Sequence, residues 1–383
     1  MSISRPSTSH SSSPSSRGLS RSLSSVESTY RGRRAATIEN DRLRVTVLVE
    51  GGHIAEILDK RTGINPLWTP GWPSVEPSSF GANTDALFGS GPDGKLLAGI
   101  MGHNVCLDIF GGPSEDEAAA GLTAHGEAAV APYDIACGDG GTLSMRTHLP
   151  LAGLAFERQI ALVDDSTQRD HEISYVRITE VVQNLGAYDR PIAWTQHVTL
   201  GPPFLEKGST QFNASATRSK VYEHEFGVGD YLPAGAVFEW PLAPRLGGGS
   251  ADLRYVTSAD RSSAYTAHLM DPRREYAFFV AFSPRARLAF GYVWRRSDYP
   301  WMGIWEENHS RTGSPWNGDE LTRGMEFGVS PFPESRRAMI ERGRLFDTPG
   351  YKWIPARGSL TVEYWVIVQP SDCCPQTLDA PVR

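Results

Sequence analysis

The residues best suited to proton transfer are two histidines that stand beside turn sequences. His125 is followed by a glycine in the segment 121–126, where the backbone can approach a ligand closely. His197 stands in an apolar run that ends in a Gly-Pro-Pro turn at 201–203. A histidine held at a strand end can have its pKa tuned near neutrality and act in general acid–base catalysis. The alternatives are a surface-loop histidine at 125 and a satisfied core histidine at 197.

A lone carboxylate stands in the segment 322–333, which is rich in glycine and proline. Glu326 lies between Met325 and Phe327. If its side chain faces inward, partial desolvation raises the pKa of Glu326 and suits it to the role of a general base. If it faces outward, it is an ordinary solvated carboxylate, and the sequence leaves both alternatives open.

The tryptophan-containing segment 301–309 holds groups suited to binding a sugar. Trp301 and Trp305 face the same way on a strand, because side chains alternate with a period of two. Aromatic rings can stack on the C–H faces of a sugar ring, and the neighbouring carboxylate of Glu306 can accept hydrogen bonds from its hydroxyls. Packing of both tryptophans in the core is the alternative.

Several other chemistries lack their motifs in this sequence. There is no Gly-x-Ser-x-Gly elbow, no Walker loop, no dinucleotide-binding glycine pattern and no His-Glu-x-x-His. The four cysteines form no Cys-x-x-Cys pair, which argues against a zinc site of the usual spacing. We therefore expect no metal, no cofactor, and free thiols in a reducing cytoplasm. The four are Cys106, Cys137, Cys373 and Cys374.

The charge is distributed unevenly along the chain. Residues 1–35 hold 14 serines, six arginines and one glutamate, a net charge of +5, whereas the whole 383-residue chain carries −7. The remainder therefore carries −12, and an acidic body argues against nucleic acid and anionic membranes as partners. Because the tail has no hydrophobic periodicity, we expect residues 1–35 to be disordered. No apolar stretch approaches the roughly 18 residues of a membrane helix.

From residue 36 the sequence consists of short β-type segments separated by glycine and proline turns. Only 334–342 is predicted to be helical. Many strands, almost no helix and no composition break predict one all-β domain over 36–383, a large antiparallel β-sandwich of two curved sheets. The predicted strands are 43–49, 53–58, 105–110, 154–163, 172–183, 192–200, 264–269, 276–282, 288–294, 301–307, 322–329 and 359–368.

Taken in order, these segments resemble the galactose mutarotase-like superfamily, and specifically bacterial aldose 1-epimerases. The Gly-Gly turn at 51–52 before an apolar strand is similar to the family's early hairpin. The order His, His, Glu also matches, and the resemblance covers roughly residues 36–369. The matching motifs are Leu122-Thr123-Ala124-His125-Gly126 for the first histidine, Thr195-Gln196-His197 for the second, and Gly324-Met325-Glu326 with Pro331 for the catalytic glutamate.

The resemblance implies a mutarotase-like β-sandwich and an isomerase that interconverts the anomers of a free sugar without a cofactor. It implies Glu326 as the base, His197 as the acid at the ring oxygen, and His125 as a hydrogen-bonding group that steadies the charge. The expected partner is a small carbohydrate, and the expected state is a monomer or a homodimer. We expect four substrate-binding residues around the catalytic set: His103, Asn104, Trp305 and Glu306.

Two features of the sequence depart from the family's pattern. Between Phe80 and His125, where the family's sugar-binding arginine is expected, there is no arginine, and Lys95 is the one lysine. The segments 73–77 and 101–106 are distinctive and look like parts of a subfamily-specific pocket.

Three alternatives to a free-sugar mutarotase therefore stay open. One is a lyase or another carbohydrate-active enzyme on the same scaffold, because a fold does not settle the reaction. Another is a non-catalytic carbohydrate-binding module. The third is a hexose-phosphate mutarotase, with Arg273-Arg274 or Arg295-Arg296 as the cations around the phosphate.

Overall fold

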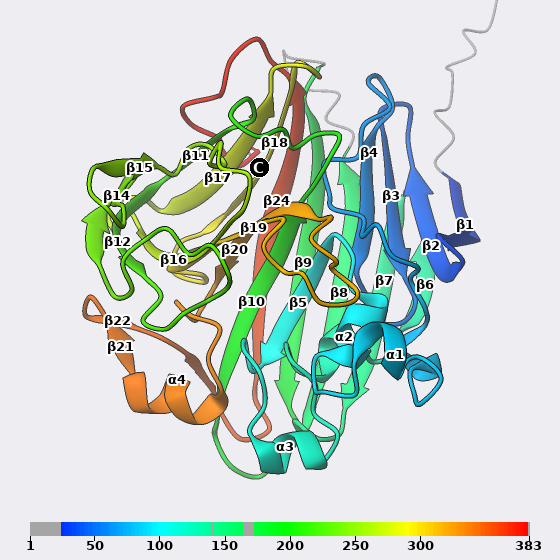
Figure 1. The fold of residues 1–383 in the computed structure, drawn as a ribbon. Helices are drawn as coiled ribbons and strands as arrows, with labels where there is room; N and C mark the ends of the chain where they lie inside the picture. The colour runs from blue at the N-terminus through cyan, green and yellow to red at the C-terminus, as the bar shows by residue number, and fades with distance from the viewer. Residues whose placement is uncertain (1–23, 139–140, 164–171, 382–383) are drawn as a thin grey trace, which may run out of the picture.

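Two large antiparallel sheets form the fold (Figure 1). The computed structural model describes residues 24–138, 141–163 and 172–381, and within these ranges the first sheet has twelve strands. In spatial order they are β1 (Ser24–Tyr30), β2 (Arg33–Glu39), β3 (Leu43–Leu48), β4 (Ile54–Asp59), β5 (His103–Asp108), β10 (Arg190–Leu200), β20 (Leu321–Gly328), β19 (Trp301–Asn308), β16 (Ser262–Met270), β12 (Ala216–Val221) and β13 (Val237–Glu239), with β23 (Lys352–Ile354) paired to β10.

The second sheet has eight strands within the same described ranges. Neighbouring strands are antiparallel in both sheets. Two small hairpins pair β14 (Leu242–Pro244) with β15 (Ser250–Asp252), and β21 (Arg344–Leu345) with β22 (Thr348–Pro349). The order of the second sheet is β11 (Gln211–Ala214), β17 (Tyr276–Ser283), β18 (Leu288–Arg295), β24 (Ser359–Pro370), β9 (Ser174–Asn184), β8 (Leu154–Val163), β7 (Thr142–Leu149) and β6 (Asp134–Gly138).

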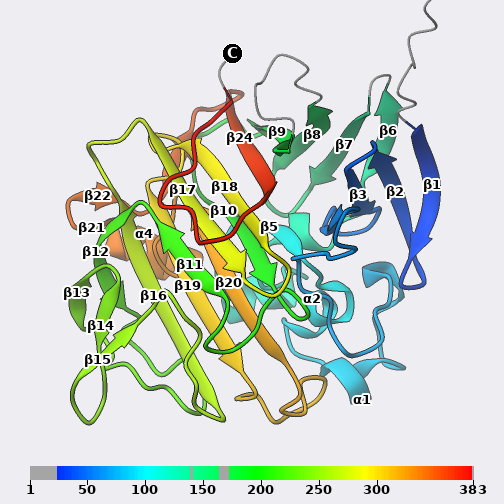
Figure 2. The ribbon, with the colours of Figure 1, turned by 90° about the horizontal axis from the view of Figure 1, so that it is seen from above.

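The main core lies between the two sheets, where alternate side chains from each sheet meet. Phe327 of β20 stacks on Trp294 of β18, with ring centroids 4.2 Å apart, and lies 5.4 Å from Tyr364 of β24. Figure 2 shows β18 and β24 lying across from β10 and β20. The fold is therefore the all-β sandwich that the sequence predicts.

Short helices and long loops lie against the other face of the first sheet (Figure 1). A second cluster of buried apolar side chains fills this side, including Trp68, Phe110 and Trp305. None of the helices in the described ranges is long and apolar enough to cross a membrane. They are α1 (Asp85–Phe88), α2 (Gly94–Gly99), α3 (Glu115–Ala119), α4 (Arg336–Arg342) and two 3-10 turns, η1 (Pro77–Ser79) and η2 (Glu127–Ala129).

The predicted elements are confirmed, and further ones accompany them. Each of the twelve predicted strand ranges corresponds to a strand, and the predicted helix 334–342 corresponds to α4. The expectation of a single helix is wrong, because α1, α2 and α3 are also present. With four to six residues each, these three are too short to show a 3.6-residue hydrophobic period.

The expected disorder of residues 1–35 is wrong for residues 24–35. β1 and the start of β2 form a hairpin there, and residues 1–23 lie outside the described ranges. The side chain that holds this hairpin against the rest of the protein is polar, so a search of the sequence for apolar side chains misses it. Arg33 is fully buried, donates to the carbonyl oxygen of Glu50 at 2.6 Å, and forms a 3.2 Å ion pair with Glu76.

Candidate active site

The central feature of the site is a contact between His197 and Glu326. The two residues are register partners on the neighbouring strands β10 and β20, so their side chains project from the same face. Nε2 of His197 lies 3.0 Å from Oε1 of Glu326, and both residues are at most 5% exposed. Nδ1 of His197 lies 3.0 Å from the hydroxyl of Thr199, which orients the imidazole from its other edge. The structure thus brings together the predicted acid and base.

Two glycines leave room for the carboxylate of Glu326. A Cβ atom added to Gly324 would lie 2.5 Å from Oε1 of Glu326. A Cβ atom on Gly303, the register partner of Glu326 on β19, would lie 2.0 Å from the hydroxyl of Tyr265. Larger residues at these positions would therefore displace the carboxylate or the tyrosine that packs beside it.

A strained loop delivers His125 to the same place. The backbone of His125 has φ of 65°, an uncommon value for a residue with a side chain, and Gly126 follows with φ of 80°. A Cβ atom on Gly126 would lie 2.1 Å from the carbonyl oxygen of Leu107 on β5. The amide of Leu107 in turn donates to the carbonyl oxygen of His125 at 3.1 Å. This docking sets the rings of His125 and His197 4.8 Å apart.

These three residues line a cavity of about 300 Å³, which is near the lower end of the usual range for ligand pockets. Most of its walls are apolar or aromatic, as is typical of a small-molecule site. Besides Glu326, the walls include two charged side chains from different loops, Asp93 and Arg311. The remaining lining residues are Leu96, Leu97, Ile100, Phe110, Gly111, Gly112, Ala124, Phe226, Tyr265, Trp305, Trp316 and Pro333.

Burial is the main cause of the pKa shifts of Glu326, His197 and His125. It raises the pKa of Glu326 to about 8, although the neighbouring Tyr265 hydroxyl opposes this shift. It lowers the pKa of His197 well below its ordinary value, and the nearby His125 adds to that effect. Burial also lowers the pKa of His125 to about 4, with a further contribution from the positive charge of Arg311. Near neutral pH the His197–Glu326 pair therefore holds one proton.

The predicted Trp305 is a wall of the cavity. Its ring centroid lies 5.7 Å from that of His197, and its Nε1 finds no hydrogen-bond partner among the described residues. Leaving a buried N–H without a partner costs free energy, so this group is an available hydrogen-bond donor beside the cavity.

An arginine lines the cavity, and it comes from a segment far beyond His125 in the sequence. Arg311, in the loop after β19, places its guanidinium carbon 5.3 Å from the ring centroid of Trp305 and 4.8 Å from that of Trp316. Glu307 holds it from behind, with a 3.4 Å ion pair and a hydrogen bond from the Arg311 amide at 3.0 Å. Sequence reasoning missed Arg311. The available signal was Glu307. Strand alternation places its carboxylate on the same face as Trp305, where a buried carboxylate needs a cation such as Arg311, four residues later.

The other three predicted binding residues do not line the cavity. Asn104 projects from the cavity face of β5 but lies beneath His125, with its Oδ1 3.4 Å from Nδ1 of that ring. It therefore favours the tautomer of His125 that carries the proton on Nδ1.

His103 and Glu306 project from the opposite face of the sheet, so the expectation that they surround His125, His197 and Glu326 is wrong. His103 is buried between the sheets, where its ring nitrogens contact the Tyr292 hydroxyl at 3.1 Å and Oε1 of Gln196 at 3.0 Å. Glu306 is 1% exposed and accepts a 2.7 Å hydrogen bond from the Ser262 hydroxyl. His103 precedes Asn104, and Glu306 follows Trp305, whose side chains are on the cavity side. Adjacent residues of a strand face opposite ways, so an error of one residue reverses the face.

The distinctive segment 73–77 also has a structural role. Ser74 and Glu76 contact the buried guanidinium of Arg33. Within the described ranges, no group of three His, Cys, Asp or Glu side chains is arranged to hold a metal ion.

Known proteins match this chain in structure but not in sequence. No protein-family model matches it, and no curated protein matches it by sequence. A candidate aldose 1-epimerase from Klebsiella pneumoniae superposes with a TM-score of 0.60 at 15% identity, over 89% of this chain and 80% of that one. A galactose mutarotase-like protein from Clostridium acetobutylicum gives 0.54 at 13% identity, over 91% and 99%. Another from Lactobacillus casei gives 0.51 at 12%, over 88% and 100%. The chain therefore has the galactose mutarotase-like fold.

Proposed function

We propose that this protein is an aldose 1-epimerase-like isomerase, which interconverts the two anomers of a free sugar. The observation that carries the proposal is the 3.0 Å contact between His197 and Glu326 on the wall of a small, largely apolar cavity. Anomer exchange needs one group that removes a proton and one that supplies a proton at a short distance from it. A buried pair that shares one proton meets that need without a metal or a nucleotide.

The proton moves within the pair before the chemistry begins. When it resides on His197, Glu326 is a carboxylate base and His197 an imidazolium acid. Glu326 takes the proton of the anomeric hydroxyl, the C1=O1 bond forms, the bond from C1 to the ring oxygen breaks, and His197 protonates that oxygen. The aldehyde then rotates about the C1–C2 bond. Ring closure on the other face returns both protons along the same routes.

The remaining walls of the cavity would bind and orient the sugar. The unpartnered Nε1 of Trp305 suits a hydroxyl, and the Trp305 ring offers a flat apolar surface. Arg311, stacked on Trp305 and Trp316, supplies hydrogen-bond donors in a fixed plane. His125 adds a neutral imidazole next to His197.

Anomer exchange measured by NMR tests this proposal. The panel holds free glucose and galactose, their 6-phosphates, and oligosaccharide lyase substrates, with the uncatalysed rate as the baseline. Acceleration with free aldoses, lost in Glu326→Gln, supports the proposal. Binding without exchange would show a carbohydrate-binding module instead.

The hexose-phosphate alternative has less support than the free-sugar reaction. Arg273 forms a 2.9 Å ion pair with Asp271, and Arg295 a 3.0 Å pair with Glu275. Neither arginine lines the cavity, where Arg311 is the one cationic side chain among the described lining residues. Exchange confined to the phosphorylated sugars would nevertheless favour this alternative over the free-sugar reaction.

A further inference from the structure

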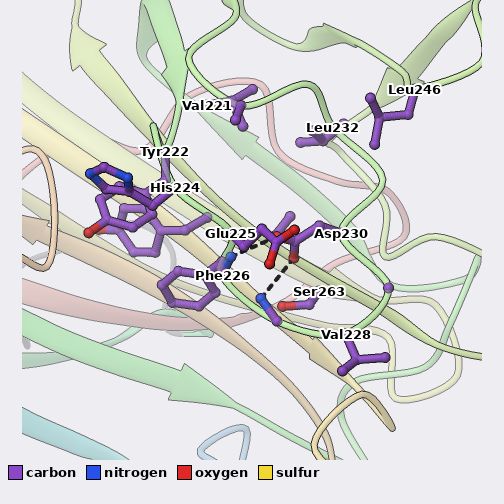
Figure 3. A pocket seen from close by; sticks show the side chains of 15 residues that line it. Val221, Tyr222, His224, Glu225, Phe226, Val228, Asp230, Leu232, Leu246 and Ser263 are labelled. Atoms are coloured by element: carbon purple, nitrogen blue, oxygen red, sulfur yellow. Dashed lines mark hydrogen bonds between the residues drawn. The ribbon is translucent and has the colours of Figure 1, made fainter.

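A second pocket adjoins the candidate active site. It has a volume of about 740 Å³, more than twice that of the catalytic cavity, and Phe226 and Tyr265 line both. Figure 3 shows that one loop supplies His224, Glu225, Phe226 and Val228 to this pocket, with Leu232 and Leu246 on another side. The two hollows therefore share a wall and lie next to each other along β16.

A continuous row of aromatic rings joins the two hollows. The row starts inside the catalytic cavity at Phe110, whose ring centroid lies 6.2 Å from that of Tyr265. Tyr265 lies 5.4 Å from Phe226, and Phe226 lies 5.9 Å from Tyr222 in the second pocket. The row ends at His224, 5.5 Å from Tyr222. Neighbouring rings of the row are tilted or edge-on, at 37° to 87° to one another, so they offer a series of separate aromatic contacts to a ligand that is itself a series of rings with C–H faces.

The loop that forms this pocket is held in place before any ligand binds. The carboxylate of Asp230 accepts hydrogen bonds from the amides of Phe226 at 2.7 Å and Gly227 at 3.1 Å, as the dashed lines in Figure 3 show. The amide of Ser263 on β16 donates to the carbonyl oxygen of Gly229 at 3.2 Å. A preformed pocket lowers the ordering cost of binding.

The exposed surface of the pocket is unusually apolar for a loop. Val228 is 69% exposed and Leu246 is 58% exposed. Both line the pocket, next to the exposed polar side chains of His224 and Glu225. An apolar surface with a few polar groups is the usual composition of a ligand site.

We infer that the second pocket is a subsite for a second sugar ring, so that the preferred substrates are reducing oligosaccharides rather than monosaccharides. This inference rests on the proposed function. Anomer exchange requires a free C1 hydroxyl, which an oligosaccharide carries only at its reducing end. That ring occupies the cavity at His197 and Glu326. The next ring stacks along Phe226 and Tyr222, with its hydroxyls toward His224 and Glu225.

The test compares disaccharides with monosaccharides in the full-length protein. We measure kcat/KM for anomer exchange of maltose and lactose against glucose and galactose. We expect about a tenfold advantage for the better disaccharide, the size of one good aromatic contact. His224→Ala removes the end of the row, and Ala234→Trp fills the pocket from an exposed turn. Both should abolish the advantage and leave the monosaccharide rates unchanged. The matched control is His148→Ala, an exposed histidine on β7.

Equal kcat/KM for both classes of sugar, or an advantage that both variants retain, would overturn the subsite. If no sugar shows accelerated exchange, the proposed function fails, and calorimetric binding then decides the subsite separately. Tighter binding of maltose or lactose than of glucose, lost in Ala234→Trp and kept in His148→Ala, supports the second ring. Equal binding of mono- and disaccharides overturns it.

Discussion

At the scale of single residues, Glu326 and His197 carry the proposed chemistry. Glu326→Gln keeps the size of the side chain and removes the proton acceptor, so we expect anomer exchange to slow by about 10²- to 10⁴-fold. His197→Asn should cost a similar factor, and the double variant little more, because groups that act as a unit are not additive.

The control for these variants is Glu157→Gln, a 43% exposed carboxylate on β8. It should leave the rate unchanged. Rate and melting temperature are measured on the same preparations. A well-folded Glu326→Gln protein with a near-normal rate would remove Glu326 from the mechanism.

The raised pKa of Glu326 also predicts a pH-dependent stability. In the unfolded chain its pKa returns to the ordinary value of 4.5, whereas in the folded protein it is about 8. Between these values the folded state holds more protons, so the free energy of unfolding falls as pH rises through this window. Glu326→Gln mimics the protonated form and does not suffer this loss.

Relative to wild type, the Gln variant should therefore gain roughly 1 to 3 kcal/mol between pH 5 and pH 8.5. Urea unfolding of both proteins at the two pH values measures this difference. A difference that does not change with pH would show that Glu326 is ionised across the window. The exchange rate of the wild type should also fall above about pH 8, where the pair loses its proton.

The meeting of His125, His197 and Glu326 at one cavity could be expected from sequence because each stands in a recognisable local pattern. Which other residues line the cavity could not be predicted as well, since neighbouring strand residues face opposite sides. Glu306 was predicted for the site, but Glu307 lies on the cavity side and holds Arg311. Which of two adjacent carboxylates faces the cavity depends on register with β16 and β20, which no single strand encodes.

At the scale of elements, the site depends on how the loop that carries His125 packs on β5. Gly126→Ala forces a Cβ atom to within 2.1 Å of the Leu107 carbonyl oxygen at φ of 80°. We expect the loop to move and His125 to leave its place by His197, with at least tenfold loss of rate and a destabilisation of about 1 to 3 kcal/mol.

Gly121→Ala is the matched control for this prediction. Gly121 also has a positive φ, of 96°, but a Cβ atom there meets only Leu151, at 4.0 Å. It should show strain without displacement, and hence a lower melting temperature with a normal rate. If both variants lose activity equally, general strain rather than the docking on β5 is responsible.

The N-terminal hairpin should depend on one buried arginine. Arg33→Met removes a fully buried cation, which breaks its ion pair with Glu76 and takes the guanidinium donors from the carbonyl oxygens of Glu50 and Gly99. Such a loss costs about 3 kcal/mol or more. The adjacent Arg34, with a 62% exposed side chain, should cost below about 1 kcal/mol when changed to Met. Chemical unfolding of both variants measures the difference, and equal losses would contradict the assigned role of Arg33.

At the scale of the whole molecule, the sandwich followed from the density of strand-like segments, and the fold agrees with structures at 12–15% identity. The full lining of the cavity did not follow, because part of it comes from loops that meet only in the folded chain. Asp93, Phe226, Arg311 and Pro333 stand in four separate segments with no shared motif. Their convergence is set by how β5, β10, β20, β19 and β16 lie side by side.

The sharing of one proton between His197 and Glu326 also determines what the reaction exchanges with its surroundings. In the proposed cycle, Glu326 gains the proton that it later returns, and His197 loses the proton that it later recovers. Each turnover therefore ends in the protonation state in which it began, with no net uptake or release of protons. At constant pH, the rate should then be independent of buffer concentration, because no external acid or base has to reset the enzyme.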